Sequence, residues 1–206
     1  EEDAKDEPKA AANVWALIRK VKADDADETE RRTAAVLLLH MADGGNPDAA
    51  YAVGKLLMDG GIMQKDAPKA LECFRISADA GNSYAMFQLG KHSMTGEDAT
   101  KDNAEALRWF TAAAEQGNAA AQYALGKLYL SGEAVPKDAE AALLWFTRSA
   151  EQGNQYAQFF VDHWSEARSP SSFIAATRLL HHMSRIFQDN TPPKRGGRIQ
   201  LDKKLL

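Results

Sequence analysis

The residue types that most often carry out chemistry are few in this sequence and poorly arranged for it. None of the histidines forms an H-E-x-x-H or comparable metal-ligand pattern; they are His40, His92, His163, His181 and His182. On a helix the adjacent His181 and His182 would point about 100° apart, so they would not easily share one ion. No glycine-rich loop follows a strand pattern, as dinucleotide and phosphate sites require. We therefore expect no catalytic, cofactor-binding or metal site, and we do not expect this chain to be an enzyme.

Lysines, in contrast, recur at a regular spacing. Lys55, Lys91 and Lys127 follow one another at steps of 36 residues. A row of lysines suits an acidic partner segment, although each exposed ion pair contributes under about 1 kcal/mol. The alternative is a solvated helix face with no binding role.

Aromatic residues recur at the same 36-residue step, at Tyr51, Phe87, Tyr123 and Phe159, and the first three of them stand four positions before the lysines. Packing between repeats is one interpretation of this column, and the lining of a peptide groove is the other. Further candidates for partner contacts lie on the same predicted helices: Tyr84, Gln88, Gln122, Tyr156 and Gln158.

These columns belong to a longer internal repeat. The letters Ala-Glu-Gln-Gly-Asn occur at 114–118 and again at 150–154, and the 36-residue step also connects Gly45, Gly81, Gly117 and Gly153. Within a unit, Ala121, Leu125 and Leu128 have the i, i+4, i+7 spacing of a helix face, and a second apolar helix pattern follows. The pattern therefore predicts that each unit folds as a helical hairpin, and such hairpins must stack to cover their apolar surfaces.

Turn and cap residues define the ends of these helices. The repeated glycine after each second helix suits a C-terminal position with positive φ. The asparagine that follows it suits the N-cap of the next helix. Asp66, Asp102 and Asp138 are expected to cap the second helices, and Glu105 fits a capping box with Asp102. Gly90 and Gly126 lie inside first helices, which indicates close approach of the paired backbones.

The repeat divides the chain into four parts. Residues 1–44 are predicted to hold degenerate capping helices at 10–22 and 28–43, and residues 45–164 hold the repeats. Residues 165–190 are predicted to form a C-terminal capping helix, and 191–206 a basic extended tail. Cys73 stands where two later repeats have Trp109 and Trp145, so we interpret it as a packing residue.

The motif Ala-x-x-x-Leu-Gly-Lys-Leu-Tyr-x-x-Gly at 121–132, with Trp-Phe-x-x-Ser-Ala-Glu-Gln-Gly-Asn at 145–154, resembles the Sel1-like repeat, a relative of the tetratricopeptide repeats. The resemblance runs from about Gly45 to Val161. It implies an all-α fold, a right-handed α-solenoid of helix-turn-helix repeats. It also implies a non-enzymatic adaptor or scaffold that binds another protein or peptide segment through its concave face.

A second resemblance concerns the C-terminal end. Residues 175–187, the Pro192-Pro193 pair and Lys203-Lys204 are similar to the end of certain mobilisation relaxases of Firmicutes conjugative elements, which carry Sel1-like repeats. Because the chain begins without methionine, we expect a fragment whose catalytic part lies upstream. In this alternative the chain is an accessory domain in DNA mobilisation.

Composition and charge limit the kinds of partner that the chain is expected to have. The net charge is −4 with 26% charged residues, which does not predict a surface built throughout for nucleic acid. Only the tail from Lys194 to Leu206 is strongly basic, and it predicts at most weak DNA contact; continuation into a further helix is the other interpretation. The longest apolar runs, such as 34–39, are only six residues long, too short for a membrane span. We expect a cytoplasmic bacterial protein, and the sequence does not name its partner.

Overall fold

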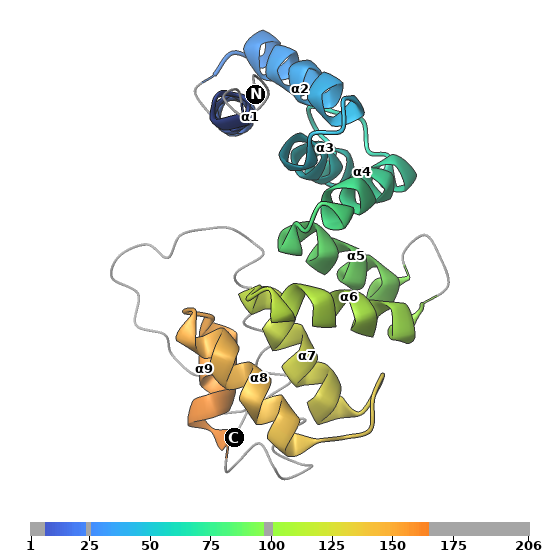
Figure 1. Ribbon diagram of the computed structural model, residues 1–206, viewed down its shortest axis with the longest axis vertical. Helices are drawn as coiled ribbons and strands as arrows, with labels where there is room; N and C mark the ends of the chain where they lie inside the picture. Colours follow the sequence, from blue (N-terminus) through green and yellow to red (C-terminus); the bar gives the residue numbers. More distant parts are fainter. Residues whose placement is uncertain (1–6, 24–25, 97–100, 165–206) are drawn as a thin grey trace, which may run out of the picture. The chain divides into compact units, whose positions relative to one another are not determined.

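The structure is a computed structural model that describes residues 7–23, 26–96 and 101–164 (Figure 1). Within these ranges the regular elements are all helices: α1 (Glu7–Lys22), α2 (Glu28–Asp43), α3 (Pro47–Asp59), α4 (Ala67–Asp79), α5 (Ser83–Thr95), α6 (Asn103–Glu115), α7 (Ala119–Ser131), α8 (Ala139–Glu151) and α9 (Gln155–Asp162). The all-α expectation is confirmed.

Consecutive helices pair as hairpins, and each hairpin packs on the next. The pairs are α1–α2, α3–α4, α5–α6 and α7–α8, and the contacts α2–α3, α4–α5 and α6–α7 join them in chain order. This serial stacking is that of an α-solenoid. The first unit of the chain, residues 1–161, contains it, whereas residues 162–206 form a second unit. The predicted C-terminal helix and tail lie outside the described residues, so those boundaries stay predictions.

Capping residues stand at the starts of the first helices, where the sequence predicts them. Asn46, Asn82 and Asn118 are the N-caps of α3, α5 and α7, and the Oδ1 atom of Asn118 accepts the N–H of Ala121 at 3.0 Å. The glycine before each asparagine has positive φ, for example +84° at Gly117. Asparagine thus satisfies the first amides of the next helix after glycine has turned the chain.

The capping box predicted at the start of α6 forms only in part. Asp102 Oδ1 accepts the N–H of Glu105 at 2.9 Å, as expected. The Glu105 carboxylate, however, accepts a hydrogen bond from the Ser93 hydroxyl at 3.0 Å, and the Asp102 N–H donates to the Ser93 carbonyl at 2.8 Å. In a complete capping box the Glu105 carboxylate would accept the Asp102 N–H. Here Ser93 on α5 bonds to both groups instead.

Each of the three regular hairpins is closed by a glycine under a phenylalanine ring. A Cβ placed on Gly54, Gly90 or Gly126 would lie 2.7, 2.8 or 2.6 Å from the ring of Phe74, Phe110 or Phe146, respectively. Real Cβ atoms essentially never come so close to another heavy atom. The predicted close approach of the paired helices is confirmed, and the ring fills the space left by the missing side chain.

The first hairpin uses a different pair at the same positions. One repeat before Gly54 and Phe74 stand Ile18 and Leu38, so a larger residue replaces glycine and a smaller one replaces phenylalanine. Leu38 is fully buried and Ile18 packs against the core. The second helix of this degenerate hairpin has the predicted bounds, whereas α1 begins at Glu7, earlier than the predicted Ala10.

Candidate functional site

The three lysines occupy equivalent places on the first helices of successive hairpins: Lys55 on α3, Lys91 on α5 and Lys127 on α7. Lys91 and Lys127 are exposed, and Lys55 is half-buried. The Nζ atom of Lys55 lies 3.2 Å from Asp59 Oδ1, one helical turn on. The position of Asp59 is taken by Thr95 in α5 and Ser131 in α7. Among the described residues, Lys91 and Lys127 therefore have no carboxylate partner.

The aromatic column packs inside the hairpins and also joins neighbouring ones. The rings of Tyr51, Phe87 and Tyr123 lie 6.0, 5.7 and 5.8 Å, centroid to centroid, from the phenylalanine of the same hairpin. Tyr51 also contacts Tyr84 of the next hairpin at 6.2 Å, and Tyr123 contacts Tyr156 at 6.0 Å. The column thus has a packing role. Tyr84 is nevertheless 64% exposed, so it leaves ring surface open to a partner.

The glutamines that we considered as contacts are placed differently from one another. Gln88 on α5 makes a side-chain hydrogen bond to Tyr51, and Gln158 is exposed on α9. Gln122 is buried: its Nε2 donates to the Ala114 carbonyl at 3.1 Å, and its Oε1 accepts from Gln152 Nε2 at 2.7 Å. Because this amide already links two hairpins, we leave Gln122 out of the surface proposed below.

The Tyr123 ring contacts both one of the three lysines, Lys127, and the buried Phe146 ring of its own hairpin. Lys127 Nζ lies 5.8 Å from the centre of the Tyr123 ring, a cation–π distance. Burial, with a smaller contribution from neighbouring Tyr156, raises the pKa of Tyr123 to about 12, from an ordinary value of 10.0. Burial also raises the pKa of Tyr51. These phenols are held in their neutral form.

The raised pKa of Tyr123 predicts a loss of stability in alkali. A group whose pKa is higher in the folded state stabilises the fold below its unfolded pKa, and this contribution is lost as pH rises from about 10 to about 12. We expect the Tyr123 contribution to the free energy of unfolding to fall by about 2 kcal/mol across this window. Urea titrations at its two ends should show a smaller fall for Tyr123→Phe than for the wild type. An equal fall in both proteins would contradict the assignment.

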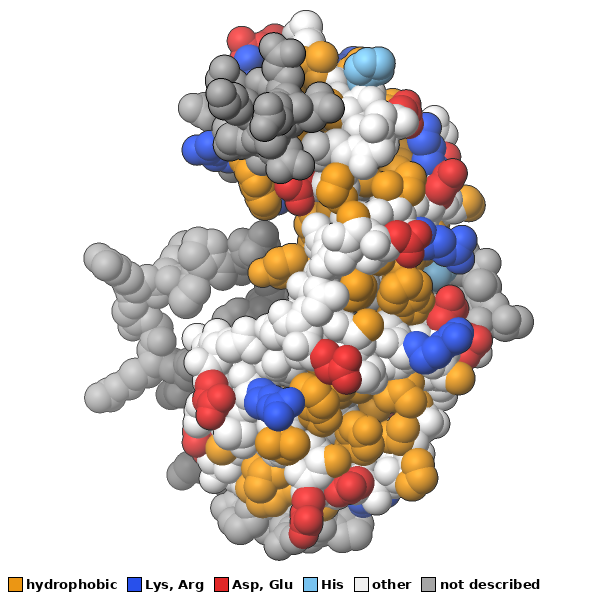
Figure 2. Space-filling model, viewed as in Figure 1, with side chains coloured by type: hydrophobic (Ala, Val, Ile, Leu, Met, Phe, Trp, Pro, Cys, Tyr) orange, Lys and Arg blue, Asp and Glu red, His pale blue; other side chains and the backbone are white. Residues whose placement is uncertain are grey.

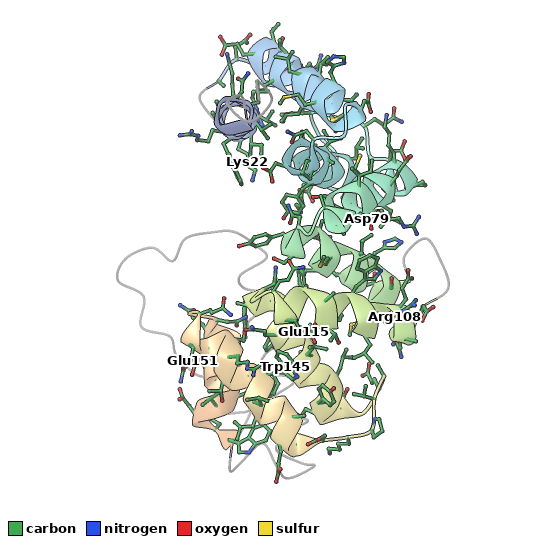
Figure 3. The ribbon with its side chains drawn as sticks, in the orientation of Figure 1. Lys22, Asp79, Arg108, Glu115, Trp145 and Glu151 are labelled. Atoms are coloured by element: carbon green, nitrogen blue, oxygen red, sulfur yellow. The ribbon has the colours of Figure 1, made fainter. Side chains whose placement is uncertain are left out.

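Charge is distributed unequally between first and second helices. Helices α5 and α7 contain no aspartate or glutamate, and their lysines are Lys91 and Lys127. The second helices α4, α6 and α8 end in a carboxylate: Asp79, Glu115 and Glu151, labelled in Figure 3. On the face drawn in Figure 2, acidic and basic side chains are interspersed among hydrophobic ones. The first helices α5 and α7 are thus basic in a chain whose net charge is negative.

We call a set of exposed and half-exposed residues on α3, α5 and α7 the first-helix stripe. It consists of the three lysines with three tyrosines and one glutamine near them: Tyr51, Lys55, Tyr84, Gln88, Lys91, Tyr123 and Lys127. The contact between Tyr51 and Tyr84 could not be predicted from the 36-residue step, because the two residues are 33 positions apart.

The described residues offer no arrangement for metal chemistry. They contain no group of three or more His, Cys, Asp or Glu side chains that could hold an ion. Cys73 is buried, and this burial raises the pKa of its thiol. Such a thiol is a poor nucleophile, in keeping with a packing role. None of the described helices has the length and apolar character needed to cross a membrane.

Two solved structures resemble this chain in sequence and fold. A Sel1 repeat protein from Oxalobacter formigenes is 29% identical, with a TM-score of 0.58 over 63% of this chain and 97% of that one. The protective antigen c5321 of uropathogenic Escherichia coli, which displays an SLR fold, is 31% identical, with a TM-score of 0.64 over 74% of this chain. The match covers 34%, or about a third, of that antigen. No curated protein matches the chain.

The Sel1 repeat family model matches three consecutive segments, residues 47–82, 83–118 and 119–154. These segments are the hairpins α3–α4, α5–α6 and α7–α8, and together they make up just over half of the sequence. Proteins with this repeat generally mediate protein–protein interactions and are typically non-enzymatic scaffolds. The chain belongs to the Sel1 repeat family.

Proposed function

We propose that this protein is a scaffold that binds an acidic segment of another protein along the first-helix stripe. The observation that carries the proposal is the charge pattern: α5 and α7 contain lysine but no carboxylate, in a chain of net charge −4. In tetratricopeptide relatives the first helices line the concave surface, and we place the bound segment on that side.

The energetics of the stripe favour an extended partner over a single charged group. An exposed lysine–carboxylate pair contributes under about 1 kcal/mol, so one pair does not hold a partner. Three lysines on three successive hairpins add their contributions only if one segment reaches all of them. The open ring surface of Tyr84 adds apolar contact between the charged positions. The expected ligand therefore alternates acidic and apolar side chains.

Selection from a display library of random peptides tests this proposal, with the full chain as bait. We expect enriched peptides to carry net negative charge and apolar or aromatic residues. Their affinity should fall as ionic strength rises, because salt screens exposed charges. Enrichment of neutral or basic peptides, or affinities insensitive to salt, would overturn the proposal.

The relaxase alternative rests on residues 175–187 and on the tail from 192 to 206, which lie outside the described residues. It stays a prediction, as do DNA contact by the tail and a cytoplasmic location. No described residue gives it specific support.

A further inference from the structure

The 36-residue step continues the first-helix stripe beyond the three repeats that match the family. One step before Tyr51 stands Trp15, and one step before Lys55 stands Arg19, both on α1. Four first helices therefore share one pattern, an aromatic residue followed four positions later by a cation. Residues four apart lie on one helix face, so each helix presents a ring beside a positive charge.

The buried positions of α1 match those of α3, which shows that the two helices have equivalent orientations toward the core. Val14 and Val21 of α1 are buried, and so are their equivalents one step later, Ala50 and Leu57 of α3. Because the same positions face the core on both helices, Trp15 and Arg19 stand on α1 where Tyr51 and Lys55 stand on α3, and they are more exposed than these two. Helix α1 also packs against both α2 and α3.

The Trp15 side chain on α1 is open to solvent, with 53% of its surface exposed. Arg19 is exposed beside it and donates from Nε to the Trp15 carbonyl at 3.4 Å. Tryptophan and arginine are, with tyrosine, the residue types most enriched among the interface residues that contribute most of the binding energy.

Arg19 also has charge available for a partner. The neighbouring Lys20 lies 3.2 Å from Glu30 Oε2, so its charge is already paired. Among the side chains that the structure describes, no carboxylate lies within ion-pair distance of Arg19. The guanidinium can donate two parallel hydrogen bonds to an incoming carboxylate, which lysine does not.

We infer that the degenerate hairpin α1–α2 is a fourth binding unit, in which Trp15 packs on an apolar side chain of the acidic segment and Arg19 pairs with one of its carboxylates. The inference rests on the proposed function and extends it from three units to four. The bound segment then continues past Tyr51 onto α1.

Binding of a library-selected acidic peptide to variants of the full chain tests this extension. We expect Trp15→Ala to weaken binding at least fivefold and Arg19→Glu at least threefold. Trp15→Phe should retain most of the affinity, because a ring remains. Because both residues are exposed, thermal unfolding midpoints should stay close to that of the wild type.

Two matched changes on α2 control for general effects in the same hairpin. Leu37→Ala removes another exposed apolar side chain, and Arg32→Glu reverses another exposed cation. Both should leave affinity within a factor of two. If Trp15→Ala and Arg19→Glu bind like these controls while reversal of the three stripe lysines abolishes binding, the fourth unit is refuted and the three-unit proposal stands. If lysine reversal also has no effect, the proposed function itself fails.

Discussion

Replacing Phe110 by alanine should lower the free energy of unfolding by about 3–5 kcal/mol, the range for truncating a buried phenylalanine. The ring is 2% exposed and lies over Gly90, where no side chain can move in to fill the space. Repeat proteins gain stability from each unit and from the interfaces between units, so loss of the central hairpin also weakens both neighbours. Urea unfolding followed by circular dichroism measures the effect.

A double-mutant cycle with Gly90→Ala separates the glycine–phenylalanine contact from simple loss of volume. In the wild type the added methyl group collides with the Phe110 ring, at a cost of about 1–3 kcal/mol, which outweighs the gain of about 1 kcal/mol in helix propensity. In the Phe110→Ala background the ring is gone, so the same methyl group should stabilise the protein. A change of sign is expected. An equal destabilisation in both backgrounds would show that the two residues do not act as a pair.

The first hairpin already contains a version of this exchange. Ile18 and Leu38 stand where the other hairpins have glycine and phenylalanine, and Leu38 is fully buried. A larger residue on one helix is thus matched by a smaller one on the other, as volume-conserving exchange requires.

Much of the fold could be predicted because its signals are local and recur. The period of Gly45, Gly81, Gly117 and Gly153 gives the hairpins, and positive φ at these positions follows from the turn that each must make. The caps at Asn118 and Asp102 could be predicted because each side chain accepts a hydrogen bond from an amide only three residues away.

The candidate site was harder to predict because it depends on contacts between hairpins. Gln122 lies on the predicted helix, yet its amide is occupied by Ala114 and Gln152. Glu105 matches a capping box, yet its carboxylate accepts a hydrogen bond from the Ser93 hydroxyl of the preceding helix. Trp15 and Arg19 lie in the predicted helix 10–22 and stand one 36-residue step before Tyr51 and Lys55, but the sequence alone does not show that both are exposed.

Reversing the three stripe lysines should weaken binding of an acidic peptide at least tenfold, or about 1.4 kcal/mol. The variant Lys55→Glu, Lys91→Glu, Lys127→Glu converts three attractive contacts into repulsive ones. The binding free energy at each site therefore changes by up to twice the contribution of one exposed ion pair. Lys91 and Lys127 should contribute most to the loss of affinity, because the Lys55 ammonium already forms an ion pair with Asp59 at 3.2 Å.

The most direct measurement compares this variant with Lys69→Glu, Arg75→Glu, Arg108→Glu, which reverses three exposed cations on the second helices α4 and α6. Both variants lower the net charge by six, so long-range repulsion of the peptide is matched and only the position of the change differs. We predict at least tenfold weaker binding for the first-helix variant and less than threefold weaker binding for the second-helix variant at physiological ionic strength. Equal losses, or a larger loss for the second-helix variant, would contradict the assignment of binding to the first-helix stripe.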